Sequence, residues 1–146
     1  MNPSDPQLIS DLRRDEGVRY TSYKDTVGID TVGVGHNMKA HPLPEGWTFP
    51  LTDEQVDGLL AGDLLLVFSG LDAHLGWWRT LSETRQRVLA NMAFNMGVQG
   101  LLGFHNTLQF VQDGAWEDAV KGMLSSKWAK QVGQRANRLA DDMVQG

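Results

Sequence analysis

Apolar side chains recur at helical spacing along most of the chain, beginning close to its N-terminus. There the helix-start residue Ser4 precedes apolar positions three and four residues apart, and Leu12 and Glu16 share the resulting face. Gly17 then supplies a natural helix end. The pattern predicts a first helix over residues 4–16 that carries Glu16 in its last turn.

A second amphipathic pattern is longer and predicts a helix over residues 53–75. It begins after Thr52, whose expected capping-box partner is Gln55, and its apolar face includes one acidic residue, Asp63. Shorter helices are expected from a capping box at Thr80 and Glu83 to Gly97, and over residues 106–111, 116–124 and 134–144.

Between the first helix and the long one, the helical period is lost. From Tyr20 to His36 glycines separate short β-prone pieces, which predicts a small hairpin or sheet turning around Gly28. Residues 37–52 contain three prolines and are expected to form a loop. The chain therefore predicts an α+β fold that is predominantly helical, with one small β region near the N-terminus.

Length and composition fit one globular domain and exclude several kinds of site. The chain has 146 residues, of which 41% are apolar and 21% charged, as in ordinary folded domains. It has no cysteine, which excludes disulfides, zinc-thiolate sites and thiol nucleophiles. The first residues lack the features of a secretory signal. These observations favour folding in a reducing cytoplasm.

The net charge is −5 and is unevenly distributed. Residues 121–146 carry 5 basic and 2 acidic side chains, whereas the preceding part of the chain is acidic. The basic segment could face an anionic polymer, although a solvated helix face is the simpler explanation. Nothing in the sequence calls for nucleic acid or for stable membrane insertion, and the net charge favours a soluble monomer.

Glu16 has the placement of a general acid. At the end of an amphipathic helix, on or beside the apolar face, desolvation and the negative end of the helix dipole both disfavour a charged carboxylate. A carboxyl that keeps its proton can donate it to a leaving oxygen. The alternative is a structural role, in which Glu16 pairs with Arg13, Arg19 or Arg135.

Asp25 has the opposite environment, because it opens a polar, turn-rich segment and is expected to be hydrated and ionised. A hairpin turning around Gly28 is expected to bring Asp25 and Thr31 across from one another, close enough to hold one water. The alternative is that both side chains only bond turn amides. An acid and a base in contrasting environments are the parts that glycoside hydrolysis requires.

His36 and Asp63 are expected to form a structural ion pair, because an acidic residue on the apolar face of a helix needs a partner. No metal site is expected. The HExxH-like spacing is missing from the set His36, His41, His74 and His105, and the EF-hand spacing is missing from Asp25 and Asp30.

Three short motifs in this region resemble a known family. They are E-G at Glu16, K-D-T-x-G at residues 24–28 and T-x-G-x-G-H at residues 31–36, with the spacing Glu-x8-Asp-x5-Thr. This is similar to the bacteriophage-type lysozymes, the endolysins of glycoside hydrolase family 24. Supporting similarity occurs in residues 91–97, 103–108, 127–128 and 134–138, so the resemblance covers residues 8–140.

The resemblance implies an architecture and a role for each matching residue. A small β-containing lobe (roughly 18–52) and a larger helical lobe (roughly 76–146, with the first helix 4–16) would be joined by the helix 53–75 in a single catalytic domain, 1–146. Glu16 would be the acid, Asp25 and Thr31 the water-positioning pair, and His36 with Asp63 a structural pair. Gly35 and Asn37 would line one wall of the cleft and Phe94, Asn95 and Thr107 the other, with Arg135 approaching Glu16 to tune it.

The implied activity is that of a muramidase that cleaves the β-1,4 bond between N-acetylmuramic acid and N-acetylglucosamine in peptidoglycan, without metal or cofactor. An endolysin would wait in the host cytoplasm until a holin opens the inner membrane, and would then act on the periplasmic cell wall. The sequence also departs from the family. Asn95 and Lys127 stand where some members have glutamine and arginine, and the last helical segment, after Arg135, is expected to be shorter than is usual in the family.

Two other functions remain open on the sequence. A lytic transglycosylase uses one glutamate and needs no water-activating carboxylate, so the Asp25 and Thr31 pair speaks against it. A non-catalytic peptidoglycan-binding or virion module has no use for acid, base and hydroxyl together.

Overall fold

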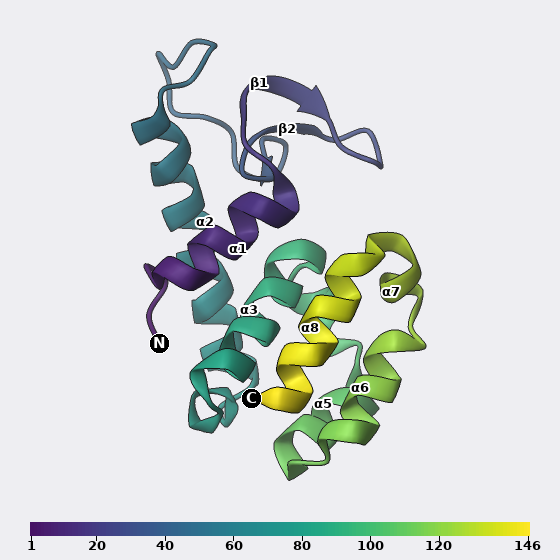
Figure 1. The fold of residues 1–146 in the computed structure, drawn as a ribbon. Coiled ribbons are helices and arrows are strands. Elements are labelled where there is room, and N and C mark those ends of the chain that lie inside the picture. The colour runs from purple at the N-terminus through teal and green to yellow at the C-terminus, as the bar shows by residue number, and fades with distance from the viewer. The chain divides into compact units, whose positions relative to one another are not determined.

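A computed structural model describes residues 1–146 and has the expected α+β composition, with 62% helix and one three-stranded antiparallel sheet. The chain forms two compact units, residues 2–66 and residues 67–146 with Met1. The first unit contains α1 (Pro6–Glu16), β1 (Arg19–Lys24), β2 (Asp30–Gly33), β3 (His36–Asn37) and the first part of α2 (Asp53–His74) (Figure 1). The second contains η1 (Trp78–Thr80), α3 (Glu83–Met96), α4 (Val98–Leu102), α5 (His105–Asp113), α6 (Trp116–Leu124), α7 (Lys127–Val132) and α8 (Gln134–Gln145).

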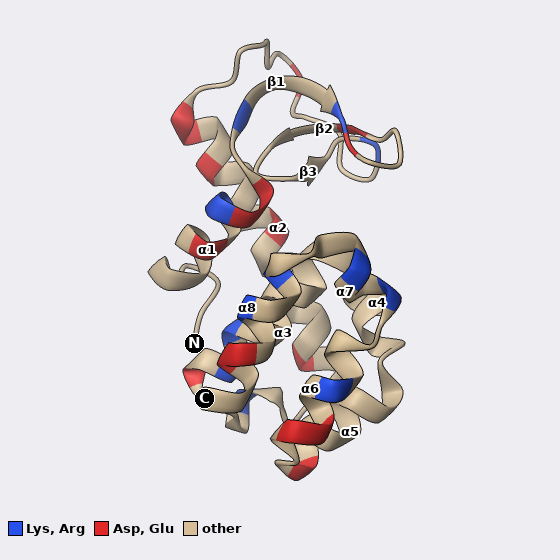
Figure 2. Ribbon diagram, turned by 45° about the vertical axis from the view of Figure 1, so that its right-hand side comes forward, with Lys and Arg blue, Asp and Glu red and all other residues tan.

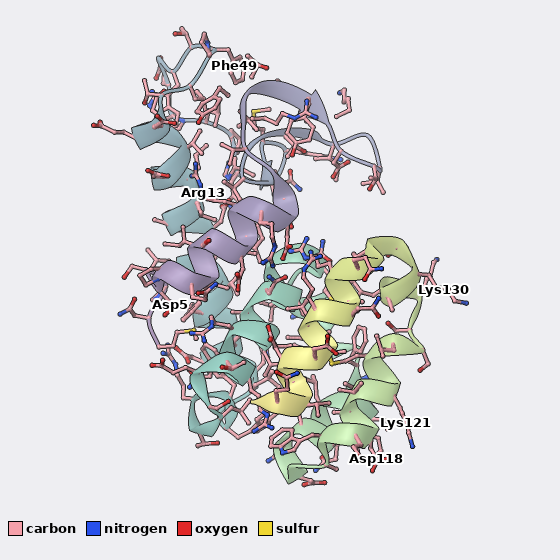
Figure 3. All side chains as sticks on the ribbon, in the orientation of Figure 1. Asp5, Arg13, Phe49, Asp118, Lys121 and Lys130 are labelled. Atoms are coloured by element: carbon pink, nitrogen blue, oxygen red, sulfur yellow. The ribbon has the colours of Figure 1, made fainter.

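Helix α1 begins one residue later than a Ser4 cap would place it. The N-cap is Asp5, whose carboxylate accepts a 2.9 Å hydrogen bond from the amide of Leu8, and Figure 3 shows Asp5 at the start of the helix. Pro6 occupies the first helical position, where its fixed φ and missing N–H cost nothing. Asp5 is therefore in the capping position, which corrects the sequence-based start.

The sheet has the order β1-β2-β3, with both pairs antiparallel. The register places Tyr23 opposite Thr31, Lys24 opposite Asp30, Thr31 opposite Asn37 and Val32 opposite His36. Strand β1 is exposed along most of its length, whereas the last three residues of β2 are buried. The predicted hairpin is thus present, extended by a short third strand.

The capping box expected before α2 is present in both directions. The amide of Thr52 donates to the Gln55 side-chain oxygen at 2.9 Å, and the amide of Gln55 donates to the Thr52 hydroxyl at 3.1 Å. The buried face of the helix comprises Val56, Leu60, Leu64, Val67, Phe68 and Leu71. None of the helices in the protein combines the length and apolar character needed to cross a membrane.

The start of α3 differs from the sequence-based expectation. Its N-cap is Ser82, which accepts from the amide of Arg85 at 3.2 Å. Thr80 instead ends η1, and its hydroxyl donates to the carbonyl of Trp77. Thr80, the cap predicted from the capping-box spacing, is therefore part of η1, and Ser82 caps α3 in its place.

Two short helices of the second unit, α4 and α7, are not predicted from the sequence, because glycines flank α4, Gly133 ends α7, and neither helix is long enough to show a full apolar period. Helix α5 begins at His105 without a side-chain cap, so the expected cap at Asn106 is wrong. The predicted helices at 116–124 and 134–144 are confirmed as α6 and α8.

Arg85 connects three helices of the second unit. Its Nε donates to the carbonyl of Met143 at 2.8 Å and an Nη to that of Val144 at 3.0 Å, near the end of α8. Its guanidinium carbon lies 3.6 Å from the ring centroid of Trp116 on α6. Helices α6 and α8 lie side by side in Figure 1. Arg85 of α3 thus satisfies carbonyls that a helix end would otherwise leave to solvent.

Candidate active site

Glu16 is the last residue of α1, as predicted. The helix ends because Gly17 adopts a φ of 73°, a conformation favourable only to glycine, while its amide donates to the carbonyl of Arg13 at 3.0 Å. The Glu16 side chain is half-buried. The chain therefore leaves the helix immediately after the carboxyl and enters β1.

Gly35 brings the backbone of the segment between β2 and β3 directly against the Glu16 carboxyl. A Cβ atom at this position would lie 2.9 Å from Glu16 Oε1, closer than real Cβ atoms approach, and the φ of Gly35 is 65°. Both the conformation and the contact require glycine. The Glu16 carboxyl occupies the space that a side chain of residue 35 would take. The surface that residue 35 presents to Glu16 is therefore main chain.

Asp25 lies in the turn between β1 and β2, where it uses one carboxylate oxygen to order the turn. Its Oδ1 accepts hydrogen bonds from the amides of Val27 at 2.9 Å and Ile29 at 2.8 Å. Its own amide donates to the carbonyl of Ile29 at 3.0 Å. The turn therefore fixes the carboxylate through Oδ1, and these hydrogen bonds do not involve Oδ2.

Thr31 is buried in β2, with 4% of its surface exposed. Its hydroxyl donates to the carbonyl of Ile29 at 2.8 Å, so the proton of Oγ1 is engaged and its lone pairs are acceptors for another group. The bonds to turn amides anticipated as the structural alternative are thus present for Asp25, whereas Thr31 bonds the turn through a carbonyl instead of an amide. These contacts use one oxygen of the carboxylate and the proton of the hydroxyl.

The register corrects the expectation that Asp25 and Thr31 lie across from one another. Thr31 pairs with Tyr23, and the Asp25 amide bonds Ile29, so the turn begins at Asp25 rather than nearer Gly28. Side chains alternate between the faces of a strand, and Asp25 follows Tyr23 by two residues. Asp25 and Thr31 are therefore diagonal neighbours on one face, a relation that typically separates Cα atoms by about 7–8 Å.

His36 of β3 contacts Asp63 of α2, as the sequence suggested. The ring Nδ1 lies 2.7 Å from Asp63 Oδ2, and the ring Nε2 lies 2.8 Å from the carbonyl of His41. Burial alone disfavours the imidazolium, but the hydrogen bond and charge of Asp63 and the His41 carbonyl outweigh it and raise the pKa of His36 above 6.5. Two acceptors around one ring suit the doubly protonated form.

The raised pKa predicts a pH-dependent stability. A histidine whose pKa rises on folding contributes stability that is complete below its unfolded pKa and is lost as the pH rises through the folded pKa. We expect Asp63→Asn to lower the free energy of unfolding by about 1.5–3 kcal/mol near pH ~5.5 and by less near pH ~8.5. Denaturant unfolding at the two pH values measures this.

Asp57→Asn is the matched control for this prediction. Asp57 lies on the same helix, and its ion pair with Arg13 (3.1 Å) is largely exposed and involves a cation that keeps its charge at both pH values. Its effect should be small and independent of pH. An Asp63→Asn effect that is equal at both pH values, or larger at the higher one, would contradict the linkage to His36.

Asn37 uses its side-chain oxygen in the turn that follows β3. Oδ1 accepts from the amides of Lys39 and Ala40, each at 2.9 Å. The side chain is half-buried. A hydrogen bond from the Asn37 side chain to substrate would therefore come from its amide nitrogen.

The other residues of the expected site belong to the second unit. Asn95 Oδ1 accepts from Trp128 Nε1 at 2.7 Å, and Asn91 Oδ1 accepts from Nε of the buried Arg135 at 3.0 Å. These two asparagines lie on neighbouring turns of α3, as the sequence indicated, and each anchors a residue of a later helix. Their side-chain oxygens thus hold the second unit together.

Thr107 and Phe94 are also placed in the second unit. Thr107 is buried on α5 against Gly122 of α6, where a Cβ would collide with its hydroxyl. Phe94 is half-buried on α3. The contact with Gly122 explains why α6 carries a glycine in its interior.

Comparison with known proteins identifies the family. The phage lysozyme family matches residues 13–141. The pre-baseplate central spike protein Gp5 of Enterobacteria phage T4 is 32% identical over 92% of this chain, which spans 27% of that protein. Probable T4-type lysozyme 1 of Dictyostelium discoideum is 26% identical, with 88% of each chain covered. The endolysin of Salmonella phage P22 is 30% identical over 65% of this chain and 64% of its own length.

With these matches and the α+β fold, the class of protein is a lysozyme-type glycoside hydrolase, an enzyme. The chain belongs to the phage lysozyme family.

Proposed function

We propose that the protein is a muramidase that hydrolyses the β-1,4 bond between N-acetylmuramic acid and N-acetylglucosamine in bacterial peptidoglycan. The observation that carries this proposal is the arrangement of two carboxyl groups in the first unit: Glu16 against the Gly35 backbone, and Asp25 on the face of Thr31. A relative named peptidoglycan hydrolase gp36, from Pseudomonas phage phiKMV, supports the substrate. It is 33% identical over 92% of this chain, which spans 15% of it.

Glu16 is the general acid of this mechanism. Its proton goes to the glycosidic oxygen as the bond from that oxygen to the anomeric carbon breaks, so the departing sugar leaves as an alcohol. The backbone at Gly35 fixes the position of the carboxyl, and proton transfer needs this because it occurs only within hydrogen-bond reach. We further propose that Arg135 tunes Glu16.

Asp25 and Thr31 position and activate the attacking water. The hydroxyl of Thr31 donates its hydrogen bond to the carbonyl of Ile29, so Oγ1 accepts one hydrogen of the water, and Asp25 Oδ2 accepts the other. With both hydrogens engaged, the oxygen lone pair is left for the anomeric carbon, and Asp25 takes up the proton released. Attack from the face opposite Glu16 inverts the configuration, and inverting enzymes separate the two carboxyls by about 6.5–9.5 Å.

The same proposal assigns the substrate contacts and requires no cofactor. The glycan strand would contact the Gly35 backbone and Asn37 in the first unit and Phe94, Asn95 and Thr107 in the second. Asn95 Oδ1 accepts a hydrogen bond from Trp128, and Thr107 packs against Gly122. Because both side chains are held in this way, they would position the sugar and would take no part in the reaction.

The deciding experiment is digestion of purified Gram-negative peptidoglycan in heavy-oxygen water, followed by mass spectrometry of the released muropeptides. A hydrolase yields reducing N-acetylmuramic ends that carry one heavy oxygen, because the attacking water stays on the product. Unlabelled anhydro ends would mean a lytic transglycosylase. No release at all, from a protein that still binds peptidoglycan, would mean a binding module.

The setting of the activity is a second proposal. An endolysin of this kind would be a monomer held in the host cytoplasm until a holin releases it to the cell wall. A relative named SAR-endolysin, from Bacteriophage PS119, is 34% identical over 56% of this chain and makes the holin requirement worth testing. Host lysis after expression with and without a holin gene decides it.

A virion location is the alternative setting, favoured by one observation. The match to the T4 protein covers 92% of this chain and 27% of that protein, so a similar sequence occurs inside a longer protein that is named a pre-baseplate central spike protein. Mass spectrometry of purified virions would find the chain there if this alternative is correct, and an endolysin would be absent.

A further inference from the structure

Tyr23 is the cross-strand neighbour of Thr31. The two residues pair directly in the antiparallel ladder of β1 and β2, so their side chains emerge on the same face with Cβ atoms about 4.5–5.5 Å apart. Tyr23 is half-buried, unlike most of β1. The side chain of Tyr23 is therefore the cross-strand neighbour of the residue whose hydroxyl the mechanism uses to hold water, and it lies two residues before Asp25.

Arg19 covers the ring of Tyr23. Its guanidinium carbon lies 4.8 Å from the ring centroid, within the range of a cation–π contact. Figure 2 shows basic residues at both ends of β1. One end of the strand thus supplies a cation to a ring near the other end.

An irregularity of the ladder makes this contact possible. Arg19 and Tyr23 are four residues apart on β1, whereas their partners Gly33 and Thr31 are two residues apart on β2. Four residues of regular strand would span about 13 Å. The extra residues on β1 bring Arg19 and Tyr23 closer in space than a regular strand would. Such bulges are often found beside active sites, where they redirect a side chain.

The surrounding charges agree with this placement. Burial raises the pKa of the Tyr23 hydroxyl, and the carboxylates of Glu16 and Asp25 raise it further, while Arg19 lowers it. Lys24 and Asp30, the next pair in the ladder, are tied to each other by an exposed 2.6 Å ion pair. Both proposed catalytic carboxylates therefore contribute to the raised pKa of Tyr23.

We propose that Tyr23, held by Arg19, is a positioning residue that fixes the side chain of Thr31 in the orientation that binds the attacking water. This inference rests on the proposed function, because it needs Thr31 to act on that water. We assign this role to the ring, since Tyr23 pairs with Thr31 and it is the ring that Arg19 covers. Tyr23 acts through Thr31 and does not touch the reacting atoms.

A double-mutant cycle tests the proposal on purified peptidoglycan. We expect Tyr23→Leu to lower kcat about 10- to 100-fold with little change in KM, because misplacement of a reacting group slows the chemical step. Tyr23→Phe keeps the ring and should stay within about 3-fold of the wild type in kcat. Tyr23→Leu added to Thr31→Ala should cost almost nothing beyond Thr31→Ala alone, because neighbours that act as one unit are not additive.

Tyr20→Leu is the matched control, because Tyr20 is the other tyrosine of β1 and its hydroxyl donates to Asp53 at 2.6 Å, a carboxylate that the proposed mechanism does not use. It should leave kcat unchanged. Losses that multiply in the Tyr23 and Thr31 double variant, or a Tyr23→Leu enzyme with wild-type kcat, would overturn the proposal.

If Tyr23→Leu fails to fold, Arg19→Gln replaces it in the same cycle. This change releases the ring without removing it and should lower kcat only in chains that retain Thr31. An active Thr31→Ala enzyme would instead refute the water-positioning part of the proposed function, and that outcome is visible before Tyr23 is examined.

Discussion

Glu16→Gln should lower kcat on peptidoglycan by about 10²- to 10⁴-fold, the usual contribution of a general acid. Glutamine has nearly the same shape and fills the space beside the Gly35 backbone, but it carries no acidic proton for the leaving sugar. Folding should be unaffected, since the end of α1 depends on Gly17 and not on the charge of Glu16. Turbidity of peptidoglycan suspensions measures the rate, and thermal unfolding measures the fold.

Two companion variants sharpen this result. Glu54→Gln makes the same chemical change at an exposed position in the first turn of α2 and should retain full activity. Glu16→Asp keeps the acid but withdraws it by one methylene, and a displacement near 1 Å is expected to cost about 10²-fold. A Glu16→Gln enzyme with substantial activity would remove Glu16 from the mechanism, whatever the product analysis showed.

Asp25→Asn should produce a loss of similar size, about 10²- to 10⁴-fold in kcat, with little loss of stability. Asparagine retains a side-chain oxygen that can accept from the amides of Val27 and Ile29, so the turn is preserved. The amide nitrogen takes the place of Oδ2, where it presents hydrogens to a water that needs an acceptor. The base is lost and the water is turned away from productive attack.

Asp30→Asn is the control for this second variant, because it removes a carboxylate from the same hairpin. Asp30 pairs with Lys24 at the surface, an interaction whose loss costs about 0–1 kcal/mol. Activity should therefore be retained. Equal losses in Asp25→Asn and Asp30→Asn would point to the general charge of the hairpin and would exclude a specific base.

Features set by short-range chemistry could be predicted from the sequence. Gly17 after an amphipathic stretch gave the end of α1 and the position of Glu16, and the Thr52 and Gln55 box gave the start of α2. A lone acid on an apolar face was enough to anticipate the contact of Asp63 with His36. In each case, a helix end or a carboxylate on an apolar face needed a hydrogen-bonding or conformational partner, and few residues nearby could provide it.

Features set by register or by competition between similar residues could not be predicted. The pairing of Thr31 with Tyr23 depends on where the turn begins, and that is decided by the amide bonds of Asp25. Ser82 caps α3 because η1 takes Thr80, a choice invisible to spacing alone. Strand alternation places Tyr23 on the face of Asp25, but the sequence alone does not show that Tyr23 pairs with Thr31.

The turn between β1 and β2 has a consequence for protein engineering. Asp25 Oδ1 accepts hydrogen bonds from main-chain amides, so the side chains of residues 26 and 27 do not take part in holding the turn. The side chain of Val27 is 75% exposed. Sequence diversity should be tolerated at residues 26 and 27, whereas an insertion or deletion would move the carboxylate relative to Thr31. A library that varies the identity of these positions at constant length could therefore graft new wall-binding chemistry beside the active site without retuning the enzyme.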